Sequence, residues 1–405
     1  MRQKIVIIGG GAAGFFAAIT CAENNPDTEI IILERGKEVL QKVKISGGGR
    51  CNVTHACFDP KELCEFYPRG NKELLGPFHQ FMTGDTMQWF EDRGVELKIE
   101  ADNRVFPVSN SSQSIMDVLL KSTTKLGIVT KLNHKVESFK KAGDQWSIIT
   151  NKGDFIADKL LIASGSNTKI WEMLEKLGHT IVQPVPSLFT FKINDKRIKE
   201  IPGVSVANAT VSIVNSEFQT NGPLLITHWG MSGPAILKLS AFGARFLAEK
   251  DYQYNVEVNW LSKPTEHVLE NLKGIRKDNQ KKQIILKSVF PAIPKRLWEN
   301  LILASEITRE SKWADVSNKQ LENLSNQLTK GLFNANGKST FKEEFVTAGG
   351  IDLKEVNFKR FESKLHSNLF FAGEVLNIDA VTGGFNFQNA WTGGYIVGNT
   401  MANNN

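Results

Sequence analysis

Short apolar runs separated by glycine turns dominate the beginning of the chain. Residues 4–8 (KIVII) form a continuous, β-branched apolar run, which is typical of a strand buried on both faces of a parallel sheet. An alanine-rich stretch with helical spacing follows to about Glu23, and a second apolar run, EIIILE, ends at Glu34. This order predicts a strand, a helix and a strand, the first βαβ unit of an α/β fold.

Further strands are indicated in the middle and near the end of the chain. Two helical regions, 78–93 and 112–127, precede short β-like segments separated by the turns KAGD and NKG. This pattern predicts a three-stranded meander over 135–140, 145–150 and 154–158. The runs KLLIA at 159–163 and NLFFAG at 368–373 are each typical of a buried strand that ends in small residues.

The first predicted turn carries a G-x-G-x-x-G spacing at Gly9, Gly11 and Gly14. Gly9 permits a tight turn, Gly11 lets the backbone approach a pyrophosphate, and Gly14 lets the helix pack close to the strand. Glu34 follows at the distance of an acid that accepts hydrogen bonds from a ribose hydroxyl. The pattern predicts a dinucleotide site; the alternative is a βαβ unit whose glycines serve only packing. The expected contacts are Gly9, Gly11, Ala12, Ala13, Gly14, Glu34 and Arg35.

The rest of the chain favours FAD over NAD as the resident dinucleotide. A βαβ start, a meander and a strand ending in small residues together describe an FAD domain of the glutathione-reductase type. Such domains close with a strand whose last acid binds the ribityl chain, here Glu374, where most relatives carry Asp. The sequence has no second strand-GxGxxG-helix unit, so NAD(P)H is expected only as a transient co-substrate. The expected contacts in the middle strands are Val136, Ala163, Ser164 and Gly165.

A last helix is predicted after the closing strand, in VTGGFNFQNAWTGGYIVG. Its N-terminal dipole would point at the pyrimidine end of the flavin. That end becomes negative on reduction, so the helix would raise the flavin's reduction potential. For Asp379, positioning the flavin and capping a loop are equally supported. The expected contacts here are Gly373, Glu374, Asp379, Gly383, Gly384, Phe385 and Asn386.

The segment SGGGRCNVTH at 46–55 allows three readings by itself: a phosphate cradle, a metal or thiol site, or a sharp turn. Within an FAD domain it becomes a second glycine-rich segment against the same cofactor, and Lys44 and Arg50 add positive charge near the phosphates. Cys51 would have a lowered thiol pKa if it faced Arg50. Because no second cysteine stands at CxxC spacing, a small buried thiol is favoured. The expected contacts are Lys44, Ser46, Gly47, Gly48, Gly49, Arg50, Cys51 and Asn52.

Composition narrows the class of protein. The chain has 405 residues, of which 41% are hydrophobic and 23% charged, as in soluble proteins with two or three domains or one large α/β domain with an insertion. The net charge of +6 is mild, so no nucleic-acid partner is expected. The four cysteines include no CxxC pair, which argues against a disulfide framework or a metal site and fits a reducing cytoplasm. Neither a signal peptide nor an apolar run of about 18 residues occurs, so we expect no export and no membrane span.

Six motifs in order give the chain a resemblance to a known family. They are GGGAAG, KISGGGRCNVT (44–54), RVFPVS (104–109), GPLLITHWGMSGPAILKLS (222–240), TAGGI (347–351) and FESKLHSNLFFAGEVLNIDAVTGGFNFQNAW (361–391). In these motifs the chain resembles the bacterial YhiN/BaiN-like flavoproteins, a family of NAD(P)/FAD-dependent oxidoreductases that includes aminoacetone-oxidase-like enzymes. The resemblance covers nearly the whole chain.

The resemblance implies an FAD domain split by an insert. The FAD domain would comprise residues 1–188 and 340–405, and the insert would comprise 189–339. Within the insert, a small β-barrel (189–262 and 332–339) would carry a helical subdomain (263–331). The residues agree, since 189–193, 204–214, 224–228 and 252–258 alternate like barrel strands, and Pro264, Pro291 and Pro294 stand near expected helix starts.

Flavin chemistry needs a hydride donor or acceptor held against N5 with limited access of water. We expect the substrate between the flavin and the insert, lined by His228 and Trp229, by Arg104 and Phe106, and by Asn386 and Gln388. The catalytic candidates are His228, Arg104 and Asn386. Each has a plainer alternative: His228 could brace the turn before the helix near Pro234, and Arg104 could pair with Asp102.

Three functions remain open from the sequence. The resemblance implies an enzyme acting on a small molecule, either a reductase of a C=C bond conjugated to a ketone that uses NAD(P)H, or an oxygen-dependent oxidase of a small amine such as aminoacetone. A flavin-binding redox sensor or docking module is the third, with the lysine-rich stretch 277–287 as its contact surface. The sequence does not determine the oligomeric state.

Overall fold

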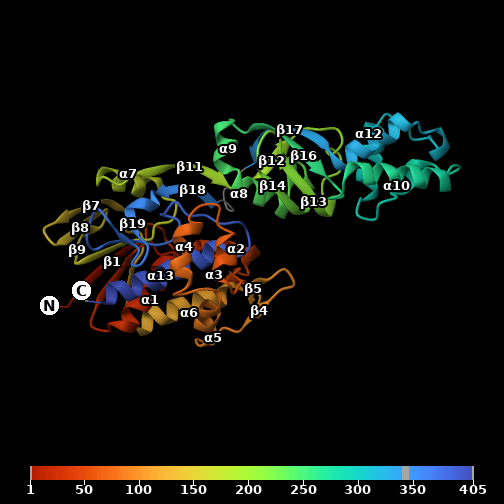
Figure 1. Ribbon diagram of the computed structural model, residues 1–405. Coiled ribbons are helices and arrows are strands. Elements are labelled where there is room, and N and C mark those ends of the chain that lie inside the picture. Colours follow the sequence, from red (N-terminus) through yellow and green to blue (C-terminus); the bar gives the residue numbers. More distant parts are fainter. Residues whose placement is uncertain (1, 340–345, 404–405) are drawn as a thin grey trace. The chain divides into compact units, whose positions relative to one another are not determined.

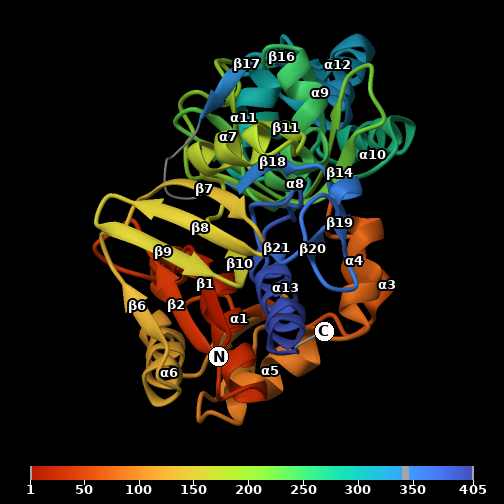
Figure 2. The same cartoon turned by 90° about the vertical axis from the view of Figure 1, so that its left-hand side faces the viewer.

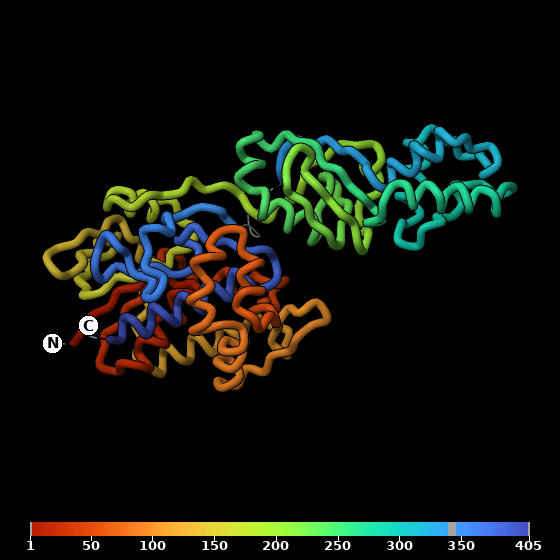
Figure 3. Tube along the Cα trace, viewed as in Figure 1, coloured from red at the N-terminus to blue at the C-terminus, as the bar shows by residue number. Residues whose placement is uncertain are grey.

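The structure of the protein is a computed structural model that describes residues 2–339 and 346–403 (Figure 1). The chain divides into two compact units. Unit 1 comprises Met1–Val185 and Val346–Asn405, and unit 2 comprises Pro186–Phe345. The Cα trace leaves unit 1 once and returns once (Figure 3). The expected divisions after residues 188 and 339 stay a prediction, and 340–345 lie outside the described residues.

A seven-stranded sheet forms the centre of unit 1 (Figure 2), in the order β19-β20-β21-β10-β1-β2-β6. The run from β21 to β6 is parallel, and β19 and β20 add an antiparallel edge. The central strands are apolar and buried, as the sequence predicted for a parallel sheet covered on both faces. The strands are Lys4–Ile8 (β1), Glu29–Leu33 (β2), Val129–Lys131 (β6), Lys159–Ile162 (β10), Val356–Asn357 (β19), Glu362–Ser363 (β20) and Leu369–Phe371 (β21).

Two long helices of unit 1 cross at very short range. Helix α1 (Ala12–Asn24) and helix α13 (Phe385–Ala402) meet where α13 carries Gly394 and Gly398. A Cβ at Gly394 would lie 2.9 Å from the carbonyl oxygen of Ala13, and one at Gly398 would lie 2.6 Å from Cβ of Thr20. Glycine is therefore required at both positions of this crossing. The close packing of the two helices fixes α13, including its start, relative to α1.

The other elements of unit 1 surround this sheet. The predicted meander is confirmed as β7–β9, but the expected helix over 78–93 is broken: one helix ends at Phe78 and the next begins at Thr83. The helices α2, α3 and α4 were not predicted from the sequence, because each is too short to show a clear 3.6-residue period. The elements are α2 (Gln41–Gly49), α3 (Pro60–Cys64), α4 (Asn71–Phe78), α5 (Thr83–Glu91), α6 (Ser112–Lys125), α7 (Thr168–Lys176), β3 (Thr54–His55), β4 (Leu97–Ile99), β5 (Arg104–Pro107), β7 (Val136–Ala142), β8 (Gln145–Thr150), β9 (Gly153–Ala157), β18 (Val346–Ile351) and the short helix η3 (Leu353–Glu355).

Unit 2 is built on a closed six-stranded barrel in the order β12-β15-β14-β13-β16-β17, which confirms the expected barrel. Strand β11 (Ile181–Ser187), which pairs with β18, leads from unit 1 into unit 2. Inward-facing apolar residues alternate with exposed ones along the barrel strands. The elements are β12 (Thr190–Ile193), β13 (Ser205–Ile213), β14 (Gln219–Thr227), β15 (Gly230–Ser232), β16 (Gln253–Asn259), β17 (Gly331–Ser339), α8 (Pro234–Phe242) and α9 (Ala244–Glu249).

A helical subdomain lies between β16 and β17, as predicted. It contains α10 (Thr265–Asp278), α11 (Lys295–Ala304) and α12 (Asn318–Thr329). Pro264 and Pro294 are the N-caps of α10 and α11, whereas Pro291 lies in the turn before α11. Within 2–339 and 346–403, no helix is both long enough and apolar enough to cross a membrane.

Candidate functional site

Three glycine-containing turns meet at the carboxyl ends of the parallel strands β1, β10 and β21. They are Gly9–Gly11, Ala163–Gly165 and Gly373–Glu374. At Gly9, where φ is +116°, a Cβ would lie only 2.3 Å from the carbonyl oxygen of Ala163, so the first two turns are in contact. In open α/β sheets, ligands bind just outside these carboxyl ends of the strands.

The glycines of the first turn have different roles. A Cβ at Gly14 would lie 2.2 Å from the carbonyl oxygen of Gly9, so both residues are needed for packing. A Cβ at Gly11 would meet no atom of residues 2–339 or 346–403 within 4 Å. Gly11 is also the N-cap of α1, and no side chain caps that helix. Gly11 therefore borders open space beside free helix N–H groups, the arrangement that binds a phosphate.

Glu34 links this turn to the end of β2. Its Oε2 accepts a hydrogen bond from the backbone N–H of Gly10 at 2.9 Å, and its Oε1 accepts one from Gly36 at 2.7 Å. The carboxylate therefore shapes the glycine turn, and each oxygen keeps a further lone pair for a ribose hydroxyl. Arg35 beside it is exposed.

The second glycine-rich segment interrupts α2. Ser46, Gly47 and Gly48 leave helical geometry, and Gly47, Gly48 and Gly49 have φ of +57°, +68° and +82°. A side chain at Gly47 would lie 2.9 Å from the backbone nitrogen of Asn52, whereas Gly48 and Gly49 border open space. Consecutive positive φ values require glycine, and the resulting loop exposes backbone beside the site.

The basic side chains near this loop have acidic partners. Arg50 Nη1 lies 2.7 Å from Glu100 Oε1, and its guanidinium stacks over Phe106 with 3.9 Å to the ring centroid. Lys44 pairs with Glu38 at 3.2 Å. The expected positive charge near cofactor phosphates stays a prediction.

Lys42 makes a contact that the sequence did not reveal. Its ammonium group pairs with the carboxylate of Glu374, so α2 contacts the end of the last strand. The two residues lie 332 positions apart, and no local pattern in a single sequence indicates such a pair.

Cys51 is a buried thiol, as the sequence analysis favoured. Its side chain is fully buried, and its backbone has φ of +60°. Burial raises the pKa of the Cys51 thiol to about 12, against a smaller lowering by a hydrogen bond to Ser46. Burial also raises the pKa of Cys21, Cys57 and Cys64. Because the thiolate is the reactive form, none of the four is a ready nucleophile.

Some buried polar atoms near the turns have no hydrogen-bond partner among the described residues. They include Oγ of Ser164, after β10, and Oδ1 of Asn52, after the second glycine segment. Buried polar atoms are nearly always satisfied in native proteins. Both positions therefore fit a bound polar group. Val136, another expected contact, is the buried first residue of β7 and pairs with Thr150.

The start of α13 is held tightly against β3. Gly383 and Gly384 have φ of +135° and +95°, and no side chain caps the helix at Gly384. A Cβ at Gly384 would lie 2.5 Å from the carbonyl oxygen of Thr54. His55 Nδ1 lies 3.1 Å from the carbonyl oxygen of Gly383, and its ring stacks on Phe385 at 4.4 Å. His55 ends the glycine-rich motif, whose spacing did not indicate this contact with α13.

The loop before α13 is fixed by its own side chains. Asp379 is fully buried and forms a two-point ion pair with Arg69. Asn386 donates to the carbonyl oxygen of Ala380 at 3.2 Å and accepts from its N–H at 3.0 Å. Catalysis by Asn386 and flavin positioning by Asp379 stay predictions. For Asp379, the structure adds a buried ion pair that neither sequence alternative contained.

Gln388 lies in the interior of unit 1 and does not line an open site. It is fully buried, with Oε1 accepting from Thr54 at 2.6 Å and from Thr86 at 3.0 Å. Its Nε2 donates to Thr392 at 3.0 Å. The residue spacing along α13 could not show which face of this helix is buried, because apolar and small residues occur on several of its faces.

The remaining candidates lie on a hairpin of unit 2 and at the start of β5 in unit 1. His228 and Trp229 form the hairpin tip between β14 and β15 in unit 2, and both are exposed. The nearby Gly230 is needed for barrel packing, because its Cβ would lie 2.3 Å from the carbonyl oxygen of Phe191. Arg104 pairs with Asp102 at 2.7 Å, as its plainer alternative stated. A catalytic role for His228 or Arg104 stays a prediction.

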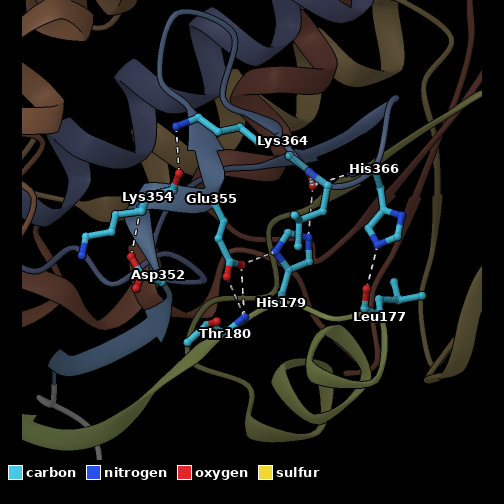
Figure 4. A network of polar contacts seen from close by, with 10 residues as sticks. Leu177, His179, Thr180, Asp352, Lys354, Glu355, Lys364 and His366 are labelled. Atoms are coloured by element: carbon cyan, nitrogen blue, oxygen red, sulfur yellow. Dashed lines mark hydrogen bonds and ion pairs between the residues drawn. The ribbon is translucent and has the colours of Figure 1, made fainter.

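Unit 1 also contains a serine, a histidine and a glutamate in hydrogen-bond contact, Ser363, His179 and Glu355; Figure 4 shows His179 facing Glu355. His179 lies between Glu355 and Ser363, with its Nε2 3.1 Å from Ser363 Oγ. Ser363 Oγ also accepts from the N–H groups of Leu365 and His366, each at 3.0 Å. Because Ser363 and His179 are buried and the hydroxyl oxygen is already engaged, this cluster is structural and not a nucleophile site.

The chain matches the family model described as HI0933-like protein Rossmann domain over residues 3–400. It is 25% identical over 410 residues to the 3-dehydro-bile acid delta(4,6)-reductase of Clostridium scindens, covering 99% of both chains. It is also similar to the ribosomal RNA dihydrouridine synthases of Haemophilus influenzae (26% over 404 residues) and Escherichia coli (27% over 407 residues), covering 96% of each chain.

Solved structures share the fold. The 3-ketosteroid delta1-dehydrogenase of Sterolibacterium denitrificans superposes with a TM-score of 0.52 at 9% identity, covering 99% of both chains. The 3-ketosteroid-delta4-(5alpha)-dehydrogenase of Rhodococcus jostii does so with a TM-score of 0.50 at 13% identity, covering 99% of this chain and 97% of the other. At these identities the likeness concerns the fold alone.

Proposed function

The chain belongs to the HI0933-like family, and from this membership we propose that it is an FAD-dependent oxidoreductase that reduces a carbon–carbon double bond conjugated to a carbonyl group. The observation that carries the proposal is the open edge of the unit 1 sheet. There a Cβ at Gly11, Gly48 or Gly49 would meet nothing within 4 Å among the described residues, and the neighbouring turns carry Ser164 Oγ and Asn52 Oδ1, which have no hydrogen-bond partner there.

The residues at this edge fit FAD. The uncapped start of α1 at Gly11 would hold the pyrophosphate, and Glu34 would accept from the adenosine ribose. Glu374, at the end of the last strand, would bind the ribityl chain, and the uncapped start of α13 would face the pyrimidine end. When bound, FAD supplies hydride transfer through N5. The chain's own part is to orient the ring, limit water and stabilise charge.

The substrate class rests on what two relatives' names have in common. A 3-dehydro-bile acid delta(4,6)-reductase and a dihydrouridine synthase each saturate a C=C bond conjugated to a carbonyl group. Such a bond accepts hydride at the carbon distant from the carbonyl and a proton at the nearer one. We therefore favour the reductase over the amine oxidase. NAD(P)H is proposed as the donor, docking transiently.

An absorbance spectrum followed by anaerobic reduction tests the proposal. We expect a yellow protein that NADH or NADPH bleaches, and whose colour an α,β-unsaturated ketone restores without oxygen. Bleaching by aminoacetone alone, with peroxide formed in air, would support the oxidase instead. If the protein bleaches but no acceptor of either kind reoxidises it, the redox-sensor alternative is favoured. A colourless protein that cannot be reconstituted with FAD contradicts the central proposal.

RNA is a second candidate substrate, because two relatives are named as ribosomal RNA dihydrouridine synthases. The end of α10 and the segment after it expose Lys277, Lys281, Lys282 and Lys287. Lys312 is brought beside them, because residue 283 forms a bridge with it. Mass spectrometry of uridine-containing transcripts incubated with the reduced protein tests for dihydrouridine, and strongly salt-dependent RNA binding would accompany it. Absence of both outcomes would leave the composition-based expectation of no nucleic-acid partner standing.

A further inference from the structure

We propose that His55 is a positioning residue that fixes the orientation of the peptide between Gly383 and Gly384, and that this peptide tunes the bound flavin. The inference rests on the proposed function, because it assigns the start of α13 to the flavin. It concerns the last residue of the motif at 46–55, for which the spacing indicated no contact with α13.

His55 is held from both sides. It ends β3, which pairs with β5 through Arg104. Its ring stacks on Phe385, and Phe385 stacks on Phe66 with ring centroids 4.2 Å apart. The backbone of Phe385 is anchored as well, because the buried hydroxyl of Tyr67 donates to its carbonyl oxygen at 2.6 Å. The imidazole therefore has little freedom to turn away from α13.

The hydrogen bond of His55 selects one orientation of the peptide between Gly383 and Gly384. Its Nδ1 lies 3.1 Å from the carbonyl oxygen of Gly383. A peptide unit is planar and trans, so the N–H of Gly384 points opposite to that carbonyl, away from His55. Two adjacent glycines permit the reverse orientation at little steric cost. With the bond in place, the Gly384 N–H keeps one direction at the uncapped start of the helix.

The bond does not require a charged imidazole. Burial lowers the pKa of His55, the bond to Gly383 and the nearby Asp102 raise it, and Arg104 lowers it. A carbonyl oxygen only accepts, so neutral His55 must carry its proton on Nδ1. The imidazolium form also has a proton on Nδ1. The peptide orientation therefore persists on both sides of the His55 pKa.

A reduced flavin carries negative charge at its pyrimidine end, and aligned N–H donors at a helix start stabilise that charge. Loss of one aligned donor should shift the equilibrium between oxidised and reduced flavin about tenfold. For a two-electron couple, this shift corresponds to a midpoint potential lower by about 30 mV.

Three substitutions separate the hydrogen bond from the ring stacking. His55→Phe keeps a ring against Phe385 but removes the donor, whereas His55→Asn places an amide N–H near the position of Nδ1 without a ring. Phe66→Leu disturbs the stack from its far side and leaves the donor intact. Midpoint potential and flavin absorbance spectrum would be measured on the FAD-loaded full chain, together with the melting temperature.

We expect a potential about 30 mV lower for His55→Phe and a potential close to that of the wild type for His55→Asn and Phe66→Leu. An unchanged potential in His55→Phe, or an equal fall in His55→Asn, overturns the role of the hydrogen bond. If His55→Phe does not fold, His55→Leu removes the donor with a smaller side chain and is judged by the same outcomes. A wild-type chain that binds no FAD contradicts the proposed function itself, which keeps the two failures distinct.

Discussion

His179 Nδ1 lies 2.8 Å from Glu355 Oε2, with the imidazole buried and the carboxylate half-buried in unit 1 (Figure 4). On its other side, Ser363 Oγ accepts two backbone N–H groups, so its own hydrogen is directed to His179 Nε2. Both lone pairs of that hydroxyl are then in use. The network therefore holds His179 neutral with its proton on Nδ1. A second proton on Nε2 would break the hydrogen bond that Nε2 accepts from Ser363.

Acid should destabilise the protein through this network. Burial lowers the pKa of His179, hydrogen bonding and charge from Glu355 raise it, and His366 lowers it, with a net lowering from 6.5. The unfolded chain thus binds more protons below pH 6.5, and stability falls with pH by at most about 1.4 kcal/mol per unit from this group. We expect urea unfolding between pH 7.5 and 5.5 to be less pH-dependent in His179→Gln than in the wild type. Equal slopes in the two proteins would contradict this assignment.

Glu355 adds to the same trend at lower pH. Burial raises its pKa, but hydrogen bonds from Thr180 and His179 outweigh burial, so its pKa lies below 4.5. Its contribution is present above pH 4.5 and is lost as the pH falls through the lowered value. The two groups therefore weaken the fold in successive windows as the pH falls.

The glycines of the first turn should separate folding from cofactor binding. Gly9→Ala brings a Cβ to 2.3 Å from the carbonyl oxygen of Ala163 at a φ of +116°, so we expect a loss of about 2–4 kcal/mol in the free energy of unfolding. In Gly11→Ala the new Cβ meets no atom within 4 Å in the part of the chain that the structure describes, and the position has an ordinary φ of −96°. Gly11→Ala should fold normally but bind FAD at least about tenfold more weakly, because the new methyl group would occupy the space where the pyrophosphate is expected. Urea unfolding of the apoprotein and titration with FAD measure the two effects, and normal FAD affinity in Gly11→Ala would move the phosphate site elsewhere.

How far the sequence predicts this molecule depends on the range of each interaction. The βαβ unit, the meander and the barrel strands follow from local periodicity, and Gly9, Gly11 and Gly14 stand at a known spacing. The pairs Lys42–Glu374 and Arg69–Asp379 join residues more than 300 positions apart, and His55–Gly383 does the same. A single sequence does not show such contacts. From the sequence we also expected Gln388 to line the substrate site, whereas its side chain is fully buried. Periodicity does not reveal which face of an apolar helix packs against the rest of the protein.

The buried ion pair between Arg69 and Asp379 should be a major support of the loop before α13. The Asp379 side chain is fully buried and that of Arg69 is 13% exposed. Asp379→Asn removes the negative charge and leaves a guanidinium in a poorly solvated place, which costs about 3–5 kcal/mol in comparable cases. We expect a clear drop in the urea midpoint. The double substitution Arg69→Met, Asp379→Leu should lower the free energy of unfolding by less than the sum of the losses in Arg69→Met and in Asp379→Leu. Strict additivity of the two losses would show that the two residues act independently.

Arg50 and Cys51 are neighbours with different expected effects on FAD retention. Cys51→Ala removes a buried thiol whose raised pKa of about 12 makes it unreactive, so it should leave FAD affinity within about threefold of the wild type. Arg50→Ala removes both the pairing with Glu100 and the stacking on Phe106, and it should weaken FAD binding about tenfold. A larger effect from Cys51→Ala would restore the thiol hypothesis.

Glu100→Gln then shows how Arg50 acts. If Arg50 braces the glycine loop through its ion pair, Glu100→Gln should weaken FAD binding nearly as much as Arg50→Ala, because the brace is lost in both. If the guanidinium acts by its charge on the phosphates, Glu100→Gln should preserve or increase affinity, since it removes the neutralising carboxylate. The pairing distance of 2.7 Å between Arg50 Nη1 and Glu100 Oε1 favours the brace, and titration of the three apoproteins with FAD at two salt concentrations decides between the two.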